Sequence, residues 1–175
     1  MYELERPPHR LHAGPHEAQA ERIRDLHRYW LSKCRDGRLP TRAAIDPAEI
    51  RALLPHIILA EIETPFAIRY RLVGTAVAKV HGDDFTGRLH GTVTGFAGAG
   101  LDESFRRAVE RAAPVFGHSG LDAGDGTWIG FDYAILPLSE DGDRVDKCLA
   151  IEIADAPDPH VPPGNPAGLT LDPDR

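Results

Sequence analysis

Hydrophobic and polar residues alternate most regularly over residues 66–73. One side of this stretch consists of Phe66, Ile68, Tyr70 and Leu72, and the other of Ala67, Arg69 and Arg71. This period of two predicts a strand with one buried face. Gly74 is placed to end the strand, and Thr75 can cap a short helix over 76–80.

Further strands are predicted on both sides of this stretch. Residues 57–62 are apolar at nearly every position, which is typical of a central strand covered on both faces. The dipeptide Thr64-Pro65 turns the chain, so the two strands should form an antiparallel hairpin. Three later segments are predicted as strands separated by turns rich in glycine and aspartate, namely 115–121, 128–138 and 145–153.

Two longer segments carry apolar residues at helical spacing. In 16–35 the stripe expected to be buried consists of Ile23, Leu26, Trp30, Leu31 and Cys34. In 101–113 the apolar face consists of Leu101, Phe105, Ala108, Val109 and Ala112. Asp46 and Pro47 together favour the start of another short helix over 48–54.

The order of these elements predicts one α+β domain flanked by tails. We expect residues 1–15 to form a flexible N-terminal tail and 16–54 a helical extension. The core should span 55–154. Because prolines recur throughout 155–175, this C-terminal segment is predicted to be disordered.

Composition narrows the range of functions. A formal net charge of −7 at pH 7 argues against nucleic acid as a main partner. No apolar run approaches membrane-spanning length, and the polar N-terminus does not look like a signal peptide. Cys34 and Cys148, the only cysteines, lie too far apart in sequence to indicate a disulfide scaffold. A cytoplasmic protein without a membrane partner is therefore expected.

Several short motifs together resemble a PAS (Per-Arnt-Sim) sensory domain, in particular a bacterial branch of PAS-like proteins that often stand as single domains. The motifs are Tyr29-Trp30, 39–47, 53–57, 70–75, 85–88 and 136–142. The resemblance implies a five-stranded antiparallel sheet in the spatial order 2-1-5-4-3. Helices between the second and third strands would close one face over a pocket, and the leading helix would cover the other face or join a dimer.

The resemblance also indicates where a small ligand would lie, without naming it. The residues expected to line the pocket are Tyr70, His81, His90, Phe105, Phe131, Tyr133 and Ile135. For the aromatic rings, plain core packing is the alternative interpretation. For the histidines, the alternative is a solvent-facing or capping role.

Cofactor chemistry finds little support in the sequence. The helix 101–113 lacks the histidine that haem-binding PAS domains commonly place there as an axial ligand. Neither cysteine lies in the Asn-Cys-Arg motif of flavin-based light sensors. The histidines of the terminal segments do not show metal-ligand spacing, and no nucleophile motif occurs. We therefore expect no haem, flavin adduct, metal site or enzymatic activity, and the identity of any cofactor stays unknown.

The favoured hypothesis is a cytoplasmic PAS-type sensor that binds a small molecule or a partner protein and signals by association. A ligand-free interaction adaptor and, less favoured, a small enzyme on an α+β scaffold are the alternatives. The apolar stripe of 16–35 is wider than one sheet face covers, which favours a homodimer. Its interface would use Ile23, Leu26, Trp30 and Leu31.

Overall fold

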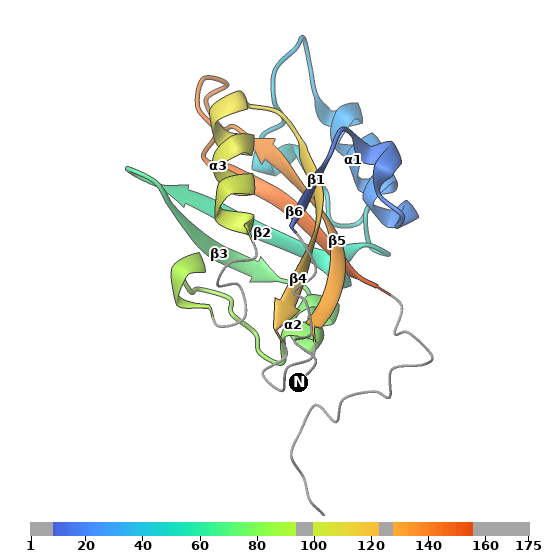
Figure 1. The fold of residues 1–175 in the computed structure, drawn as a ribbon. Helices are drawn as coiled ribbons and strands as arrows, with labels where there is room; N and C mark the ends of the chain where they lie inside the picture. The colour runs from blue at the N-terminus through green and yellow to red at the C-terminus, as the bar shows by residue number, and fades with distance from the viewer. Residues whose placement is uncertain (1–8, 94–99, 123–127, 156–175) are drawn as a thin grey trace, which may run out of the picture.

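The computed structural model describes residues 9–93, 100–122 and 128–155 of the chain. Its helices are α1 (Glu21–Lys33), α2 (Thr75–His81) and α3 (Leu101–Arg111), with short 3-10 turns η1 (Pro15–Glu17), η2 (Arg42–Ala44), η3 (Leu54–His56) and η4 (His90–Thr92). Its strands are β1 (Arg10–His12), β2 (Ile57–Glu63), β3 (Ala67–Val73), β4 (Val115–Asp122), β5 (Trp128–Leu138) and β6 (Lys147–Ala154). Figure 1 shows one twisted sheet with α3 on one side and α1 on the other.

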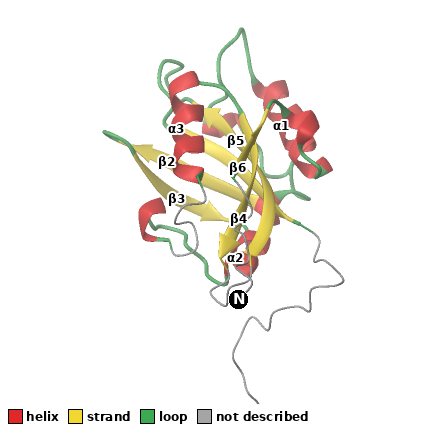
Figure 2. Ribbon diagram, in the orientation of Figure 1, coloured by secondary structure: helices red, strands yellow, loops and turns green. Residues whose placement is uncertain are grey.

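The strands form a six-stranded antiparallel sheet in the order β1-β4-β5-β6-β2-β3. The predicted α+β class is confirmed, and the strands expected from sequence lie in the predicted order 2-1-5-4-3. Figure 2 shows how these strands separate the helices into two groups. Residues predicted as a central strand do form β2, which pairs with both β3 and β6.

Strand β1 was not predicted, because it lies inside the segment expected to be a flexible tail. Its residues pair with the outer edge of β4, with Arg10 opposite His118. An open sheet edge offers unpaired backbone N–H and C=O groups, so even a three-residue segment can be ordered by them. The expectation of a loose tail over 1–15 is therefore wrong for β1, and residues 1–8 lie outside the described part.

A β-bulge changes the faces of β3. Leu59 pairs with Leu72, whereas Ala60 pairs with Tyr70, so Arg71 is an extra residue in the β3 strand. A bulge re-aims the side chains that follow it. Tyr70 stays in the core, but Leu72 lies on the opposite face beside Leu59 and is 43% exposed. The prediction that Tyr70 and Leu72 share one buried face is wrong for this reason.

Helix α1 is shorter than the predicted 16–35 because η1 precedes it and Cys34 ends it. Ile23, Leu26 and Trp30 are buried against the sheet, while Leu31 is 50% exposed. The indole N–H of Trp30 donates a hydrogen bond to the carbonyl of Pro137 over 3.0 Å. These three buried residues are used inside their own chain, which corrects the expectation that they form a docking surface for a second copy.

The connection from α1 to β2 also departs from prediction. No helix forms over 48–54, where the chain runs through successive turns into η3. Asp46 still caps this region, because its carboxylate accepts a hydrogen bond from the backbone N–H of Ala48 over 2.9 Å. Proline 55 lies within η3 and prevents the turns from extending into a regular helix.

Each face of the sheet has its own hydrophobic core. Ile58 and Ala60 of β2 pack toward α2 and α3, and Ile57 packs toward α1. Cys148 is buried in the first of these cores, and this burial raises the pKa of its thiol. Strand β2 is thus covered on both faces, which explains its nearly continuous apolar sequence.

The predicted C-terminal boundary can be followed only to Asp155. The backbone N–H of Asp155 donates to the carbonyl of Gly130 over 2.8 Å, so this residue still belongs to the fold. The remainder of the predicted disordered tail, 156–175, lies outside the described residues. Within the described ranges no helix is long and apolar enough to cross a membrane.

Candidate functional site

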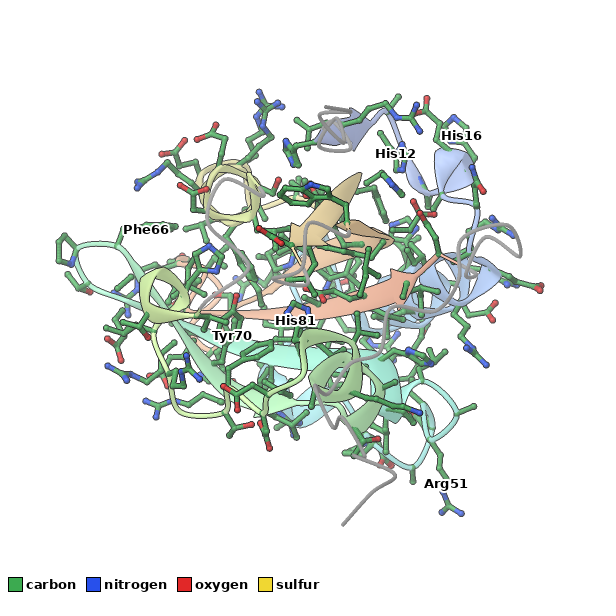
Figure 3. The ribbon with its side chains drawn as sticks, turned by 60° about the horizontal axis from the view of Figure 1, so that its bottom comes forward. His12, His16, Arg51, Phe66, Tyr70 and His81 are labelled. Carbon is green, nitrogen blue, oxygen red and sulfur yellow. The ribbon has the colours of Figure 1, made fainter. Side chains whose placement is uncertain are left out.

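The residues predicted to line a pocket all lie in the core between the sheet and the helices α2 and α3. They are Tyr70 of β3, His81 of α2, His90 of η4, Phe105 of α3, and Phe131, Tyr133 and Ile135 of β5. Figure 3 shows Tyr70 and His81 in the interior of the molecule. These residues therefore share the inner side of the sheet, and their role in binding stays a prediction.

Aromatic rings form the centre of this cluster. The ring of Phe85 meets that of Tyr70 with 4.7 Å between centroids, and that of His81 with 5.2 Å. The ring centroid of His81 also lies 6.4 Å from that of Phe131, and the ring centroid of His90 lies 6.3 Å from that of Phe105. Phe85 is fully buried but was not singled out from sequence. It follows α2 in an irregular loop, where no periodicity marks a residue as internal.

A buried histidine–carboxylate pair joins α2 to β6. Nε2 of His81 lies 2.8 Å from Oε2 of Glu152, and the side chains are only 2% and 9% exposed. Glu152 also borders a small cavity of about 140 Å³ between α2 and the ends of β5 and β6. No local pattern pairs these two residues, because the contact depends on how α2 crosses the sheet.

A second polar contact lies beneath η4. The hydroxyl of Tyr70 is 2.7 Å from Nδ1 of His90, within hydrogen-bonding distance. Burial raises the pKa of Tyr70 well above its ordinary value and lowers the pKa of His90. Both side chains are therefore neutral at pH 7, and their contact is a hydrogen bond between uncharged groups.

A third polar group lies between α3 and β5. The Tyr133 hydroxyl lies 2.7 Å from Oγ of Ser104 and 2.8 Å from Nε2 of His9. Burial raises the pKa of Tyr133 to about 12. A Cβ atom on Gly117 would lie 2.4 Å from this hydroxyl, so β4 needs glycine there. His9 lies in the segment predicted to be a flexible tail, and the pairing of β1 with β4 brings it to α3.

On the opposite face, Asp132 holds the N-terminal segment to the sheet. Its Oδ1 lies 3.0 Å from Nδ1 of His118, and its Oδ2 accepts a hydrogen bond from the backbone N–H of Gln19 over 2.7 Å. Burial alone would raise the pKa of Asp132, but the hydrogen bonds from His118, Gln19 and Ala20 outweigh it and lower that pKa. The hydrogen bond to Asp132 raises the pKa of His118. This group positions the start of α1.

Acidic and histidine side chains do not assemble into a metal centre here. In the described ranges no group of three or more His, Cys, Asp and Glu side chains is arranged to hold a metal ion. The histidines of the inner face are instead engaged with tyrosine, serine, glutamate and aromatic partners. These tyrosine, histidine, serine and glutamate side chains can therefore form hydrogen bonds within an interior lined by aromatic rings.

Comparison with known proteins agrees with this architecture. A sequence profile described as a PAS domain matches residues 18–151, which is most of the chain. The chain therefore belongs to the PAS domain family. PAS domains are sensory and signalling modules and are generally not catalytic.

Other comparisons are more limited. None of the curated proteins matches the sequence. Among solved structures, the chain is similar to one titled "Structure of an RNA-binding Light-Oxygen-Voltage Receptor", with 18% sequence identity and a TM-score of 0.48. The similarity covers 66% of this chain and 35% of that receptor chain, so the chain spans about a third of the receptor's length.

Proposed function

We propose that this PAS domain is a cytoplasmic sensor whose inner core, between the sheet and α2, η4 and α3, binds a small molecule. The ligand would contact the rings of Tyr70, Phe105 and Phe131. The polar anchors would be the His81–Glu152 pair and the Tyr133 hydroxyl. An enclosure that is mostly apolar with a few fixed polar groups is the usual composition of small-molecule sites.

The observation that carries this proposal is the buried His81–Glu152 pair. Burying an ionisable pair costs solvation energy, and apolar residues of similar volume are often as stabilising or more so. A core that only packs would therefore have little need of a carboxylate and an imidazole. Buried polar groups beside a small cavity instead support a site that recognises polar atoms of a ligand.

The second candidate is an adaptor without a ligand. It is favoured by the close ring contacts of Phe85 with Tyr70 and His81, which fill part of the same space with protein atoms. In that case the polar groups would serve only to fix one arrangement of the core. Ligand binding should then be absent, and all information would pass through protein contacts.

Signal output would occur by association, either with a second copy or with another signalling protein. With Ile23, Leu26 and Trp30 buried within the chain, Leu31 is the exposed apolar residue that α1 still presents. Catalysis, nucleic-acid binding and membrane binding do not belong to this proposal. Sedimentation of the full chain and its Leu31→Glu variant tests the dimer: the proposal expects a dimer that the substitution weakens, and a monomer throughout would leave only heterologous partners.

A thermal-melting screen tests ligand binding. Purified full chain is heated with fractions of a small-molecule extract from the producing cells, beside the Glu152→Gln and Glu63→Gln variants. A ligand at a hundred times its Kd stabilises the folded state by about 2.7 kcal/mol, enough to shift the melting temperature by several degrees. The proposal expects that shift for wild type and Glu63→Gln, and a smaller one for Glu152→Gln. No shift in any fraction would favour the adaptor.

A further inference from the structure

A groove on the outer face of the sheet is separate from the inner core. It has a volume of about 400 Å³ and runs between the 42–55 connection and strands β2 and β3. Its floor comes from β2, β3 and β6, through Ile57, Leu59, Leu72 and Leu149, and its wall comes from the turns before β2, through Ile50 and Pro55. Small-molecule sites usually measure roughly 300–1,000 Å³, so this groove is large enough for one.

The β3 bulge contributes directly to this groove. Without the bulge, Arg71 would pair regularly, and Leu72, two positions after Tyr70, would point into the inner core beside it. The bulge instead places Leu72 beside Leu59 in the groove, where it stays 43% exposed. An apolar side chain re-aimed onto an outer face without being covered is costly in water, so its position favours a bound apolar group.

The groove walls are held close together by fixed contacts. A Cβ atom on Gly74 would lie 2.3 Å from the carbonyl oxygen of Pro55, so glycine allows the wall to reach the end of β3. The backbone N–H of Gly74 also donates to the carbonyl of Ile57 over 2.7 Å. At the other end, the carboxylate of Glu140 accepts a hydrogen bond from the backbone N–H of Arg42 over 2.9 Å. The groove is therefore formed before any ligand binds.

The charge of the lining has a single sign. Among the described residues that line the groove, Arg42 and Arg51 are the charged ones and none is acidic. Nη1 of Arg42 donates to the carbonyl of Ile45 over 3.0 Å, which orients this guanidinium. Arg51 extends away from the body of the molecule (Figure 3) and makes no ion pair with any described residue. Positive charge here contrasts with the net charge of −7 for the whole chain.

We infer that the groove between the 42–55 connection and β3 binds a small amphipathic organic anion, with an apolar body on Leu59, Leu72 and Leu149 and an acidic head toward Arg42 and Arg51. Arginine recognises carboxylate and other oxyanions through charge-assisted hydrogen bonds. An apolar floor supplies most of the affinity for a hydrocarbon body. The inference is independent of the inner core and goes beyond the proposed function, because the groove lies on the other face of the sheet.

The groove also lies against strands that build the inner core. Ile57 and Leu59 line the groove, while Ile58 and Ala60 of the same strand pack on the inner face. β6 is shared in the same way, since Leu149 lines the groove and Ala150 packs inside. A ligand in the groove would thus contact the same strands as a ligand in the inner core, from the other side.

Octanoate and 1-octanol serve as matched probes, since they share a hydrocarbon chain and differ in the acidic head. Titration calorimetry and methyl NMR of the full chain should show one saturable octanoate site, with the largest shifts at Ile57, Leu59 and Leu149. Octanol should bind about tenfold more weakly, because it cannot form the charge-assisted contacts. Arg51→Gln should reduce octanoate affinity about five- to tenfold and leave octanol affinity unchanged.

The apolar side is tested by Leu72→Glu, with Lys79→Glu as the control, which introduces the same side chain at an exposed position of α2 outside the groove. Leu72→Glu should abolish octanoate binding and Lys79→Glu should not change it. If Leu72→Glu does not fold, Leu72→Ala should still weaken binding about fivefold. Absence of saturable binding below about 10 mM octanoate, or binding insensitive to Leu72 and Arg51 substitutions, would overturn the inference. A dimer dissolved by Leu72→Glu would also overturn it, by assigning the groove to a second copy.

Discussion

Nε2 of His81 lies 2.8 Å from Oε2 of Glu152, and this contact joins the last residue of α2 to β6 on the inner face of the sheet. Both side chains are nearly inaccessible to water. Removing one member of such a pair leaves the other buried without this hydrogen-bond partner, which typically costs more than the pair itself contributes. The pair is therefore both a structural link and the main polar feature of the proposed ligand site.

Glu152→Ala should lower the free energy of unfolding by about 3 kcal/mol, because it leaves the buried imidazole of His81 without this acceptor. Glu63→Ala is the matched control, since Glu63 pairs with Arg69 at a more exposed position of β2 and should lose less than about 1 kcal/mol. Urea denaturation measures both. Equal losses of unfolding free energy would show that the buried His81–Glu152 contact stabilises the fold no more than an exposed ion pair does.

Stability should depend on pH through His118 and Asp132. The pKa of His118 is raised in the folded chain. Its contribution to the free energy of unfolding is therefore complete below the ordinary histidine pKa of 6.5, and it is lost as the pH rises through the folded pKa. The pKa of Asp132 is lowered in the folded chain. Its contribution to the free energy of unfolding is therefore present above the ordinary aspartate pKa of 3.8, and it is lost as the pH falls through the folded pKa. Asp155 raises the pKa of His118 and Arg10 lowers it.

Wild type should therefore lose unfolding free energy through His118 as the pH rises above its ordinary pKa of 6.5, whereas His118→Gln should show a flatter profile over this range. Urea melts at a series of pH values measure the difference. Parallel profiles for the two proteins would mean that the His118–Asp132 contact is not coupled to folding, despite the 3.0 Å between Nδ1 and Oδ1.

Trp30→Ala should cost about 3–5 kcal/mol, since the indole is buried against the sheet and donates to the carbonyl of Pro137. Leu31→Ala, one position further along α1, should change stability by less than about 0.5 kcal/mol, because Leu31 is exposed. Denaturant melts compare the pair. A small loss for Trp30→Ala would contradict the packing of α1 described above.

Gly74→Ala should lower stability by about 1–3 kcal/mol, because the new methyl group would collide with the carbonyl of Pro55. Gly91→Ala is the control, since a Cβ atom at Gly91 meets no atom within 4 Å. Its effect should stay within about 0.5 kcal/mol. If thermal and urea melts give the two variants the same stability, the close approach of η3 to β3 is not a requirement of the fold.

The sequence predicted the sheet and the inner-face residues because both leave local patterns. The alternation at Ile68 and Tyr70 indicates which face of β3 is buried. The apolar run of β2 indicates that this strand is buried on both faces. The position of Leu72 could not be predicted in this way, because a bulge moves a residue to the other face of the sheet without changing the residue types. Strand β1 could not be predicted either, because so short a strand forms by pairing with the open edge of β4 and has no alternating pattern of its own.

Polar partners within the site were the least predictable part. His81 and Glu152 are 71 positions apart, and His9 and Tyr133 are 124 apart. Neither spacing has a local signature, because the contacts arise from the crossing of α2 over the sheet and from the pairing of β1. The apolar residues of the inner face could be predicted from periodicity, whereas the hydrogen-bond network depends on the tertiary fold.

The proposal that the inner core holds a small molecule is tested most directly by mass spectrometry of the purified full chain. The mass is measured under native conditions and again after denaturation, for wild type and for Glu152→Gln. We predict an excess native mass of one small molecule per chain in wild type, lost on denaturation and reduced in Glu152→Gln. A native mass equal to that of the polypeptide alone, under conditions that retain a known ligand in a control PAS domain, would contradict the proposal.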